Sequence, residues 1–583
     1  MGFVDKWNDK VAASPVGWWF HLDGSGHPNA RKGSRFLTEV RGGLAIFFAM
    51  AYIIAVNASI VSETGGTCVC NGGDDDPICD QNQEYLVCVE EIRRDLVTAT
   101  AATAAMSSFF MGLLANMPVG LAPGMGLNAY FTYTVVGYHG TGPVPYEVAL
   151  TAIFVEGWIF FGLALFGMRQ WLARAIPRTI KVSMGAGIGM YLTLIGLTYS
   201  QGISLVTGAL STPVELGGCH PENRLEDGTC PDWDKMRYPA MWIGVFCGGI
   251  FTVLLMMYRV KGAIIAGILL VSIISWPRGT PVTYFPYTAV GDHSFNFFRK
   301  VVDFHRISKT LNVQDWDVAA YGGQFGLALI TFLYVDILDC TGTLYGMARF
   351  AGLTDDTTGD FEGSTLAYMV DAVCISIGAV FGCTPVTAFV ESGAGISEGA
   401  KTGLAAMVTG LCFFISVFFA PIFASIPPWA TGCVLILVGS MMVVSVTDVN
   451  WRYLGDSVPA FLTMVLMPFT YSIADGLIGG ICSYIVLNTA IWLVKTATRG
   501  RVLPPNYHER DGWTWKIPGG FAPPWMRRLA RGKKDFWRND GSVADALSEG
   551  STGERPAEPE PGTGDVEKGV DGGARTNVAA KAD

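Results

Sequence analysis

Charged residues and catalytic signatures are both scarce in this chain of 583 residues. Only 15% of the residues are charged, whereas 50% are hydrophobic and the mean hydropathy is +0.36. This composition is typical of a polytopic membrane protein and excludes an ordinary soluble domain. The sequence also lacks a metal-ligand cluster and a nucleophile–base pair, and the glycines of GSGHPNARKGS (24–34) follow no strand, as a phosphate loop would. We therefore expect no enzyme, no cofactor, no metal site and no nucleic-acid partner.

Apolar runs of roughly 20 residues, the length that crosses a bilayer, predict about fourteen transmembrane segments. They lie near 43–62, 96–115, 118–138, 147–168, 181–200, 240–258, 262–277, 325–349, 364–383, 385–400, 402–420, 430–447, 457–474 and 476–495. The runs at 118–138 and 385–400 hold too much Pro and Gly for unbroken helices. No apolar run precedes Val40, so we expect no cleaved signal peptide. The chain is predicted to be an all-α multi-pass protein.

Lysine and arginine beside the apolar runs indicate the orientation in the membrane, because these residues favour the cytoplasmic side. They precede the first run, separate the fourth from the fifth and the sixth from the seventh, and follow the last. An even number of spans with both termini cytoplasmic fits this pattern. We expect the protein to be located in the plasma membrane. The basic residues of loop 279–323 would then lie outside, but long loops obey the rule weakly.

Cysteines give an independent test of sidedness, because disulfides persist in oxidising compartments. Two predicted extracellular loops, 63–95 and 201–239, hold six of the 13 cysteines, namely Cys68, Cys70, Cys79, Cys88, Cys219 and Cys230. Sequence does not give the pairing of the first four, and a zinc site is the alternative. Their irregular spacing without a nearby His favours disulfides.

The chain carries a weak internal repeat. Residues 43–56 align with 326–339, and MPVGLAPGMG (117–126) aligns with TPVTAFVESG (384–393). Both offsets leave about seven spans in each half, which predicts a 7+7 inverted repeat.

The predicted organisation is a cytoplasmic segment 1–42, a first repeat 43–277, an extracellular connector 278–324, a second repeat 325–495, and a cytoplasmic, largely disordered tail 496–583. Within the tail, the basic stretch 525–534 is predicted to contact lipid.

Acidic residues inside the apolar runs point to a binding site at membrane depth. Asp336 and Asp339 lie within 325–350, where an ionised carboxylate is costly, and Glu391 lies within the Gly-rich stretch 382–400. The paired stretches 116–131 and 383–396 each have a Pro, an extended-looking run and then Gly, which predicts two broken helices, in spans 3 and 10, with half-helix N-termini facing a ligand. The alternative is a pair of kinks filled by neighbouring side chains.

Three stretches, APGMGLNAYF (122–131), VDILDCTGTL (335–344) and TPVTAFVESGAG (384–395), resemble the fungal AzgA-type transporters of hypoxanthine, adenine and guanine. That family has the nucleobase-ascorbate transporter fold, and the resemblance covers about residues 30–500. The Gln/Asn-rich signature of the xanthine–uric acid branch is absent from span 10. The resemblance implies proton-driven uptake of a purine nucleobase, a core domain that moves against a gate domain in an elevator-type cycle, and a homodimer.

A purine is a flat neutral heterocycle, so its site needs a few oriented polar groups and an apolar or aromatic slot. Glu391 can accept from ring N–H groups, and the resemblance makes it the main contact. The amide of Asn128 can read a carbonyl or amino edge. The predicted substrate site consists of Glu391, Asp336, Asn128, Phe389 and Gly126.

The proton-coupling group is predicted among Asp339, Asp336 and Glu391. The two aspartates are three residues apart and share a helix face, so like charge and desolvation favour keeping one of them protonated. A buried structural hydrogen-bond pair is the alternative. Two further acids, Glu156 and Asp371, are either relay groups or packed against polar partners.

Two other functions fit the same fold class. A sulfate-type anion transporter would need a cationic site, and three acids argue against it. A nucleobase channel would give flux that does not saturate and persists without a proton gradient.

Overall fold

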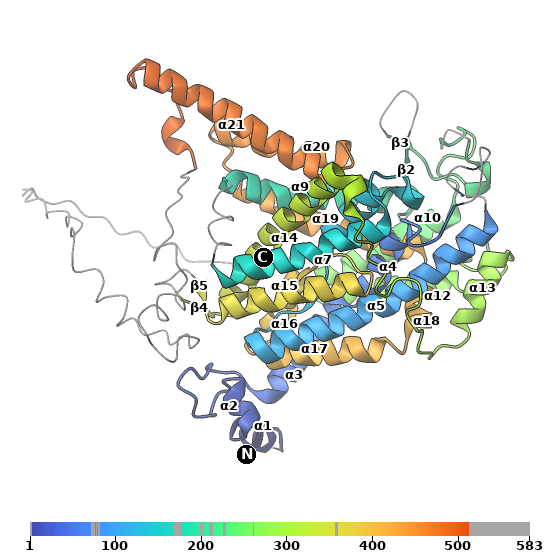
Figure 1. Ribbon diagram of the computed structural model, residues 1–583. Helices are drawn as coiled ribbons and strands as arrows, with labels where there is room; N and C mark the ends of the chain where they lie inside the picture. Colours follow the sequence, from blue (N-terminus) through green and yellow to red (C-terminus); the bar gives the residue numbers. More distant parts are fainter. Residues whose placement is uncertain are drawn as a thin grey trace, which may run out of the picture. The chain divides into compact units, whose positions relative to one another are not determined.

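Long apolar helices dominate the computed structural model of the chain (Figure 1). It describes residues 3–70, 76, 79, 82–167, 177–198, 202–208, 214–225, 229–260, 262–355 and 360–511, all within the unit Met1–Asn539. The predicted basic stretch 525–534 and most of the predicted tail lie outside the described residues.

Fourteen segments of the described chain account for the predicted spans. Eight are long and apolar enough to cross a bilayer: α3–α4 (Phe36–Met50, Ile53–Ser62), α5 (Gln83–Ala115), α7 (Tyr146–Leu165), α9 (Arg178–Leu197), α10–η4–α11 (Pro239–Ile243, Gly244–Ile250, Phe251–Met257), η5–α14 (Val318–Tyr321, Gly322–Phe350), α19–η7 (Pro428–Val443, Val444–Asp448) and α21 (Ile473–Ala497). Four are shorter: α12 (Ala263–Ser275), α15 (Ser364–Val380), α17 (Gly403–Ser416) and α20 (Leu454–Phe469).

The last two segments are interrupted, as the Pro and Gly content predicts. The first is β1 (Leu121–Pro123), α6 (Met125–Ala129) and the π-helical turn η1 (Tyr130–Val136). The second is β6 (Val386–Ala388), η6 (Val390–Ser392) and α16 (Gly393–Ser397). The predicted all-α polytopic fold with two broken helices is confirmed.

The remaining elements are short and lie before, between or after the spans. They are α1 (Phe3–Ala12), α2 (Pro15–Trp19), η2 (Tyr138–Gly140), β2 (Val206–Thr207), β3 (Glu215–Leu216), η3 (Pro221–Asn223), α13 (Ala289–Phe298), β4 (Thr354–Asp355), β5 (Asp360–Phe361), α18 (Ala420–Ala424) and η8 (Tyr507–Glu509). The predicted connector 278–324 thus contains a helix of its own.

Local sequence explains where the helices begin and end. The side chain of Asn82 caps α5 by accepting from the backbone N–H groups of Glu84 and Tyr85. At the other end Asn116 takes a left-handed conformation, with φ of 50°, and Pro118 prevents continuation. The first span begins at Phe36, ahead of its predicted start at 43, and is interrupted between α3 and α4.

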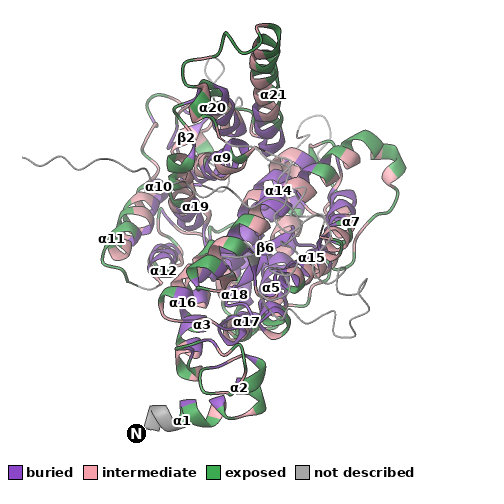
Figure 2. Cartoon of the chain, turned by 90° about the vertical axis from the view of Figure 1, so that its left-hand side faces the viewer, coloured by how far each residue is buried: buried purple, intermediate pink, exposed green. Residues whose placement is uncertain are grey.

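The spans divide into two groups, each of which takes helices from both halves of the predicted repeat. In the core group, α3 to α7 pack with α14 to α17; the main contacts are α5 with α17 and α7 with α15. In the gate group, α9 to α12 pack with α19 to α21, chiefly through α9 against α19 and α20. Figure 2 shows α10, α11, α12 and α19 beside one another, and α7 and α15 beside α14. The groups meet where α6 touches α9, α3 touches α12 and α4 touches α19.

The six loop cysteines form three disulfides. Cys68 pairs with Cys88, Cys70 with Cys79, and Cys219 with Cys230. All six loop cysteines are therefore in disulfides, as the sequence favours, and not in a zinc site. In the first loop, where the sequence left the pairing open, the Cys70–Cys79 disulfide lies inside the loop closed by Cys68–Cys88.

Candidate functional site

The two interrupted segments meet as a pair of antiparallel strands. In β1 and β6, Leu121 pairs with Ala388, Ala122 with Thr387 and Pro123 with Val386. All six residues are buried. Backbone bonds extend the pairing at both ends: Gly124 N–H donates to Pro385 O at 2.9 Å, and Phe389 N–H donates to Gly120 O at 3.1 Å. Each break therefore satisfies the polar backbone of the other, which is what permits non-helical chain at membrane depth.

A helical turn follows each strand, and these turns carry the predicted polar groups. α6 begins directly after β1 and positions Asn128; η6 begins after β6 and positions Glu391. Glu391 is half-buried, whereas Asn128 is fully buried. The crossing of the strands thus brings together residues that are far apart in sequence.

Glu391 is held by a residue that the sequence did not single out. Tyr52, in the break between α3 and α4, donates its hydroxyl hydrogen to Glu391 Oε1 at 2.7 Å. Tyr52 is 2% exposed, so its ring is fixed by packing. A charge-assisted hydrogen bond of this kind fixes the orientation of the carboxylate.

Asn128 belongs to a chain of buried polar side chains. Its Oδ1 accepts from the Thr384 hydroxyl, and Thr384 Oγ1 lies 3.4 Å from Oδ1 of Asn57. Asn57 Nδ2 in turn donates to Thr100 Oγ1 at 2.6 Å. Within the described residues, Nδ2 of Asn128 is buried and has no partner. Because an unpaired buried donor costs free energy, this amide is poised to donate to a ligand.

The two aspartates of α14 face different neighbours. Asp339 is half-buried, lies 3.5 Å from the Thr387 hydroxyl of β6, and interacts electrostatically with Glu391. Asp336 is fully buried and interacts most strongly with Asp371, then with Glu156. The structure thus brings Asp339 to the strand crossing with Glu391, while Asp336 lies among the acids of α7 and α15.

The aromatic side chains near the strand crossing differ in their surroundings. Tyr130 makes an edge-to-face contact with Phe332, with centroids 5.2 Å apart, and Phe131 packs on Tyr146 in the same way at 5.7 Å. Phe389 is 6% exposed and has no such ring partner among the described residues. Phe389 is therefore buried at the crossing among non-aromatic neighbours of the core.

Gly126 lies where the core group meets the gate group. A Cβ atom added at Gly126 would come within 2.8 Å of Ile188 Cγ2 on α9. Any side chain here would push α6 away from α9. The glycine accordingly lets the site approach the gate helices closely.

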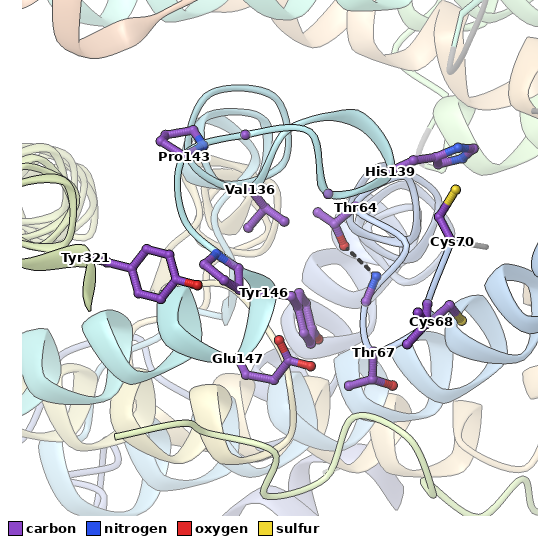
Figure 3. A pocket seen from close by; sticks show the side chains of 15 residues that line it. Thr64, Thr67, Cys68, Cys70, Val136, His139, Pro143, Tyr146, Glu147 and Tyr321 are labelled. Atoms are coloured by element: carbon purple, nitrogen blue, oxygen red, sulfur yellow. Dashed lines mark hydrogen bonds between the residues drawn. The ribbon is translucent and has the colours of Figure 1, made fainter. Parts of the chain in front are cut away.

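A cavity of about 480 Å³ lies elsewhere, at the end of the core group that carries the first disulfides (Figure 3). Its wall includes Thr64, Cys68, Glu147 and Tyr321, and none of the six predicted site residues. The hydroxyl of Tyr146, which also lines it, donates to Gly382 O at 2.8 Å, just before the second broken segment. The cavity is thus an outer feature next to the candidate site.

Sequence reasoning missed Tyr52, Asn57 and Thr384. In the internal repeat Tyr52 aligns with Val335, so the repeat gives no signal for a polar role of this tyrosine. Asn57 lies in the sequence Asn57-Ala58-Ser59, which matches a glycosylation sequon and carries no sign of a buried hydrogen-bond network. Thr384 is the first residue of TPVTAFVESGAG (384–395), but nothing in the local sequence indicates that its hydroxyl bonds to Asn128.

Comparison with known proteins gives consistent results. A family model described as Permease family (Xan_ur_permease) matches residues 82–216 and 236–478. The efflux pump notK' of Aspergillus versicolor is 66% identical over 543 residues, which cover 93% of this chain and 94% of that protein. A putative xanthine/uracil permease of Schizosaccharomyces pombe is 58% identical, over 92% of this chain and 85% of its own. The guanine/hypoxanthine permease PbuG of Bacillus subtilis is 34% identical, over 78% and 90%.

Among solved structures, the murine anion transporter Slc26a9 in its inward-facing state aligns with a TM-score of 0.52. The alignment covers 84% of this chain and 74% of that chain at 13% identity. This likeness shows the fold alone.

Proposed function

Because the chain belongs to the Permease family of xanthine/uracil permeases, we propose that it is a secondary active transporter that imports purine nucleobases, namely hypoxanthine, adenine and guanine, by proton symport. The members of this family are permeases and not enzymes. The single observation that carries the proposal is the convergence of Glu391 and Asn128 at the crossing of β1 and β6.

The substrate site is proposed to read opposite edges of the base. Glu391, oriented by Tyr52, accepts from a ring N–H group, and the unpartnered Nδ2 of Asn128 donates to a ring nitrogen or carbonyl oxygen. Phe389 stacks on the ring, and Gly126 leaves room beside α9. A base that satisfies the buried Asn128 amide removes a desolvation cost of about 1–3 kcal/mol.

An elevator-type cycle is supported by where these residues lie. All six predicted site residues are on elements of the core group, so the site can travel as one body past the gate group. Of the two roles considered for Asp336, its place among other acids supports proton coupling better than direct contact with the base. Asp339 and Glu391 remain candidates for coupling at the site itself.

The proposed membrane setting is a plasma-membrane homodimer with both termini cytoplasmic. Disulfides in both cysteine-bearing loops support an extracellular position for them. Only 11% of the most apolar part of α21 is buried inside the chain. The rest of this helix surface is left for lipid or for a second copy of the chain.

Efflux is the second candidate, because the 66% identical relative is named an efflux pump. The same site and fold serve either direction, since the direction of transport follows the gradient that drives it. The anion transporter alternative is supported only by the fold of Slc26a9, and the described site has acids where an anion would need cations.

The test is uptake of radiolabelled hypoxanthine by cells without their own purine transporters, with and without a protonophore. Saturable, protonophore-sensitive uptake by the wild type and its loss in a surface-expressed Glu391→Gln variant are expected. The matched control is Glu398→Gln, which removes a carboxylate that is paired with the exposed Arg41 instead. Uptake that never saturates would indicate a channel, and export of preloaded base under the same conditions would indicate efflux. Wild-type protein at the surface without any purine flux would overturn the proposal.

A further inference from the structure

Three acidic side chains meet inside the core group, away from the strand crossing. Glu156 of α7, Asp336 of α14 and Asp371 of α15 are each 0% exposed. α7 packs against both α14 and α15, and the three helices lie side by side in Figures 1 and 2. We call these residues the acid triad. They come from three separate spans, so no single sequence motif contains them.

The oxygens of the acid triad are largely unpartnered. Within the described residues, both carboxyl oxygens of Glu156, both of Asp336 and Oδ1 of Asp371 are buried without a hydrogen-bond partner. Oδ2 of Asp371 accepts from the Cys340 thiol at 2.8 Å. Among the described residues, no ion pair offers a cation to any of the three acids. A structural role would normally leave buried polar atoms bonded, so this pattern points to a bound ligand.

The missing ligand is best explained as the proton. Three ionised carboxylates without cations in a membrane interior carry a prohibitive desolvation cost, whereas protonated carboxyls are neutral. The described residues contain no group of acids, His and Cys arranged to hold a metal ion. Glu156 interacts electrostatically with Asp371, and Asp336 with both. Once one member ionises, a second ionisation is opposed, so the triad exchanges one proton at a time.

The acid triad is linked electrostatically to the substrate site. Asp371 interacts with Asp339, and Asp339 interacts with Glu391 at the crossing. Two thiols also lie beside Asp371: Cys340 of α14 donates a hydrogen bond to it, and Cys374 of α15 interacts with it electrostatically. A charge formed at Asp371 therefore acts on Asp339, which is itself the neighbour of the carboxylate that would contact the base.

We propose that Glu156, Asp336 and Asp371 form a proton-binding site that carries the coupling proton, separate from the carboxylate that binds the base. This inference rests on the proposed function. In the outward-facing state one carboxylate of the triad takes up a proton and becomes a neutral carboxylic acid. In the inward-facing state the same O–H bond breaks and the proton leaves to the cytoplasm, which restores the carboxylate.

The test uses the purified full-length protein in liposomes that contain a pH-sensitive dye. Two quantities are measured with hypoxanthine: counterflow exchange, which needs no net proton movement, and accumulation driven by an imposed pH gradient together with proton entry. Glu156→Gln and Asp371→Asn are expected to keep saturable counterflow but to reduce gradient-driven accumulation and proton entry to the level of wild-type vesicles without a gradient. Glu156→Asp, which keeps an ionisable group, is expected to retain coupling. Glu147→Gln on the same helix is the control and is expected to behave as the wild type.

Gradient-driven accumulation in Glu156→Gln and Asp371→Asn equal to that of the wild type would overturn the inference. If these variants do not fold, infrared spectra of the wild type decide: the carbonyl band of protonated, exchange-resistant carboxyls must be present at neutral pH, and its absence overturns the inference. A wild-type protein that neither binds nor exchanges hypoxanthine would overturn the proposed function itself, and this inference with it.

Discussion

The hydrogen bond from Tyr52 to Glu391 provides a sharp test of the substrate site. Tyr52→Phe removes one hydroxyl group and leaves the packed ring in place. The bond is 2.7 Å long and its acceptor is a carboxylate. Hydrogen bonds to charged groups contribute about 1.5–3 kcal/mol, which corresponds to roughly 10- to 150-fold in affinity. Glu391 is half-buried, so water can replace part of the bond, and we expect the lower end, an increase in KM for hypoxanthine of about tenfold.

The chain offers a matched control for this substitution. The Tyr133 hydroxyl donates to Glu63 Oε2 at 2.6 Å, which is the same chemistry away from the strand crossing. Tyr133→Phe is expected to leave the KM for hypoxanthine unchanged when uptake is normalised to surface expression. An unchanged KM in Tyr52→Phe, or an equal rise in both variants, would refute the assignment of Glu391 to the site.

Two further predictions concern the contact with the gate group and the loops. Gly126→Ala places a methyl group 2.8 Å from Ile188 Cγ2 and is expected to lower the maximal uptake rate. A second substitution in the same protein, Ile188→Ala, should restore that rate. Full activity of the single Gly126→Ala variant would contradict the close contact. Joint Cys219→Ser and Cys230→Ser substitution opens a short disulfide loop and is expected to reduce the free energy of unfolding by roughly 2–3 kcal/mol. The measurement is the Tm of the purified protein, which should fall. An unchanged Tm would show that the disulfide contributes nothing to stability.

The broken helices were predictable because their signal is local. Proline removes a backbone donor and glycine permits unusual backbone angles, and both recur at equivalent places in the two repeats. The pairing of Leu121 with Ala388 was not predictable in the same way. It joins segments more than two hundred residues apart in sequence, and no local pattern fixes the register of two three-residue strands.

The first span shows the limit of hydropathy. Its predicted start at 43 excluded the charged residues Glu39 and Arg41, which reduce the hydropathy of any window containing them. In the structure α3 begins at Phe36 because Glu39 is buried against backbone N–H groups of Lys401 and Thr402. A charged side chain that finds buried donors elsewhere in the chain can thus lie inside a helix that hydropathy would end.

The two aspartates of α14 show why spacing alone does not assign a role. Residues three apart on a helix diverge by about 60° around the axis, so they can share a face and still meet different neighbours. At Asp339 the neighbour is β6, where Thr387 and Glu391 make the surroundings polar. At Asp336 the neighbours are α7 and α15, whose own acids leave it without a hydrogen-bond partner in the described chain. The proposed division between base recognition and proton carriage rests on this packing, and under that proposal one helix couples two ligands that never need to touch.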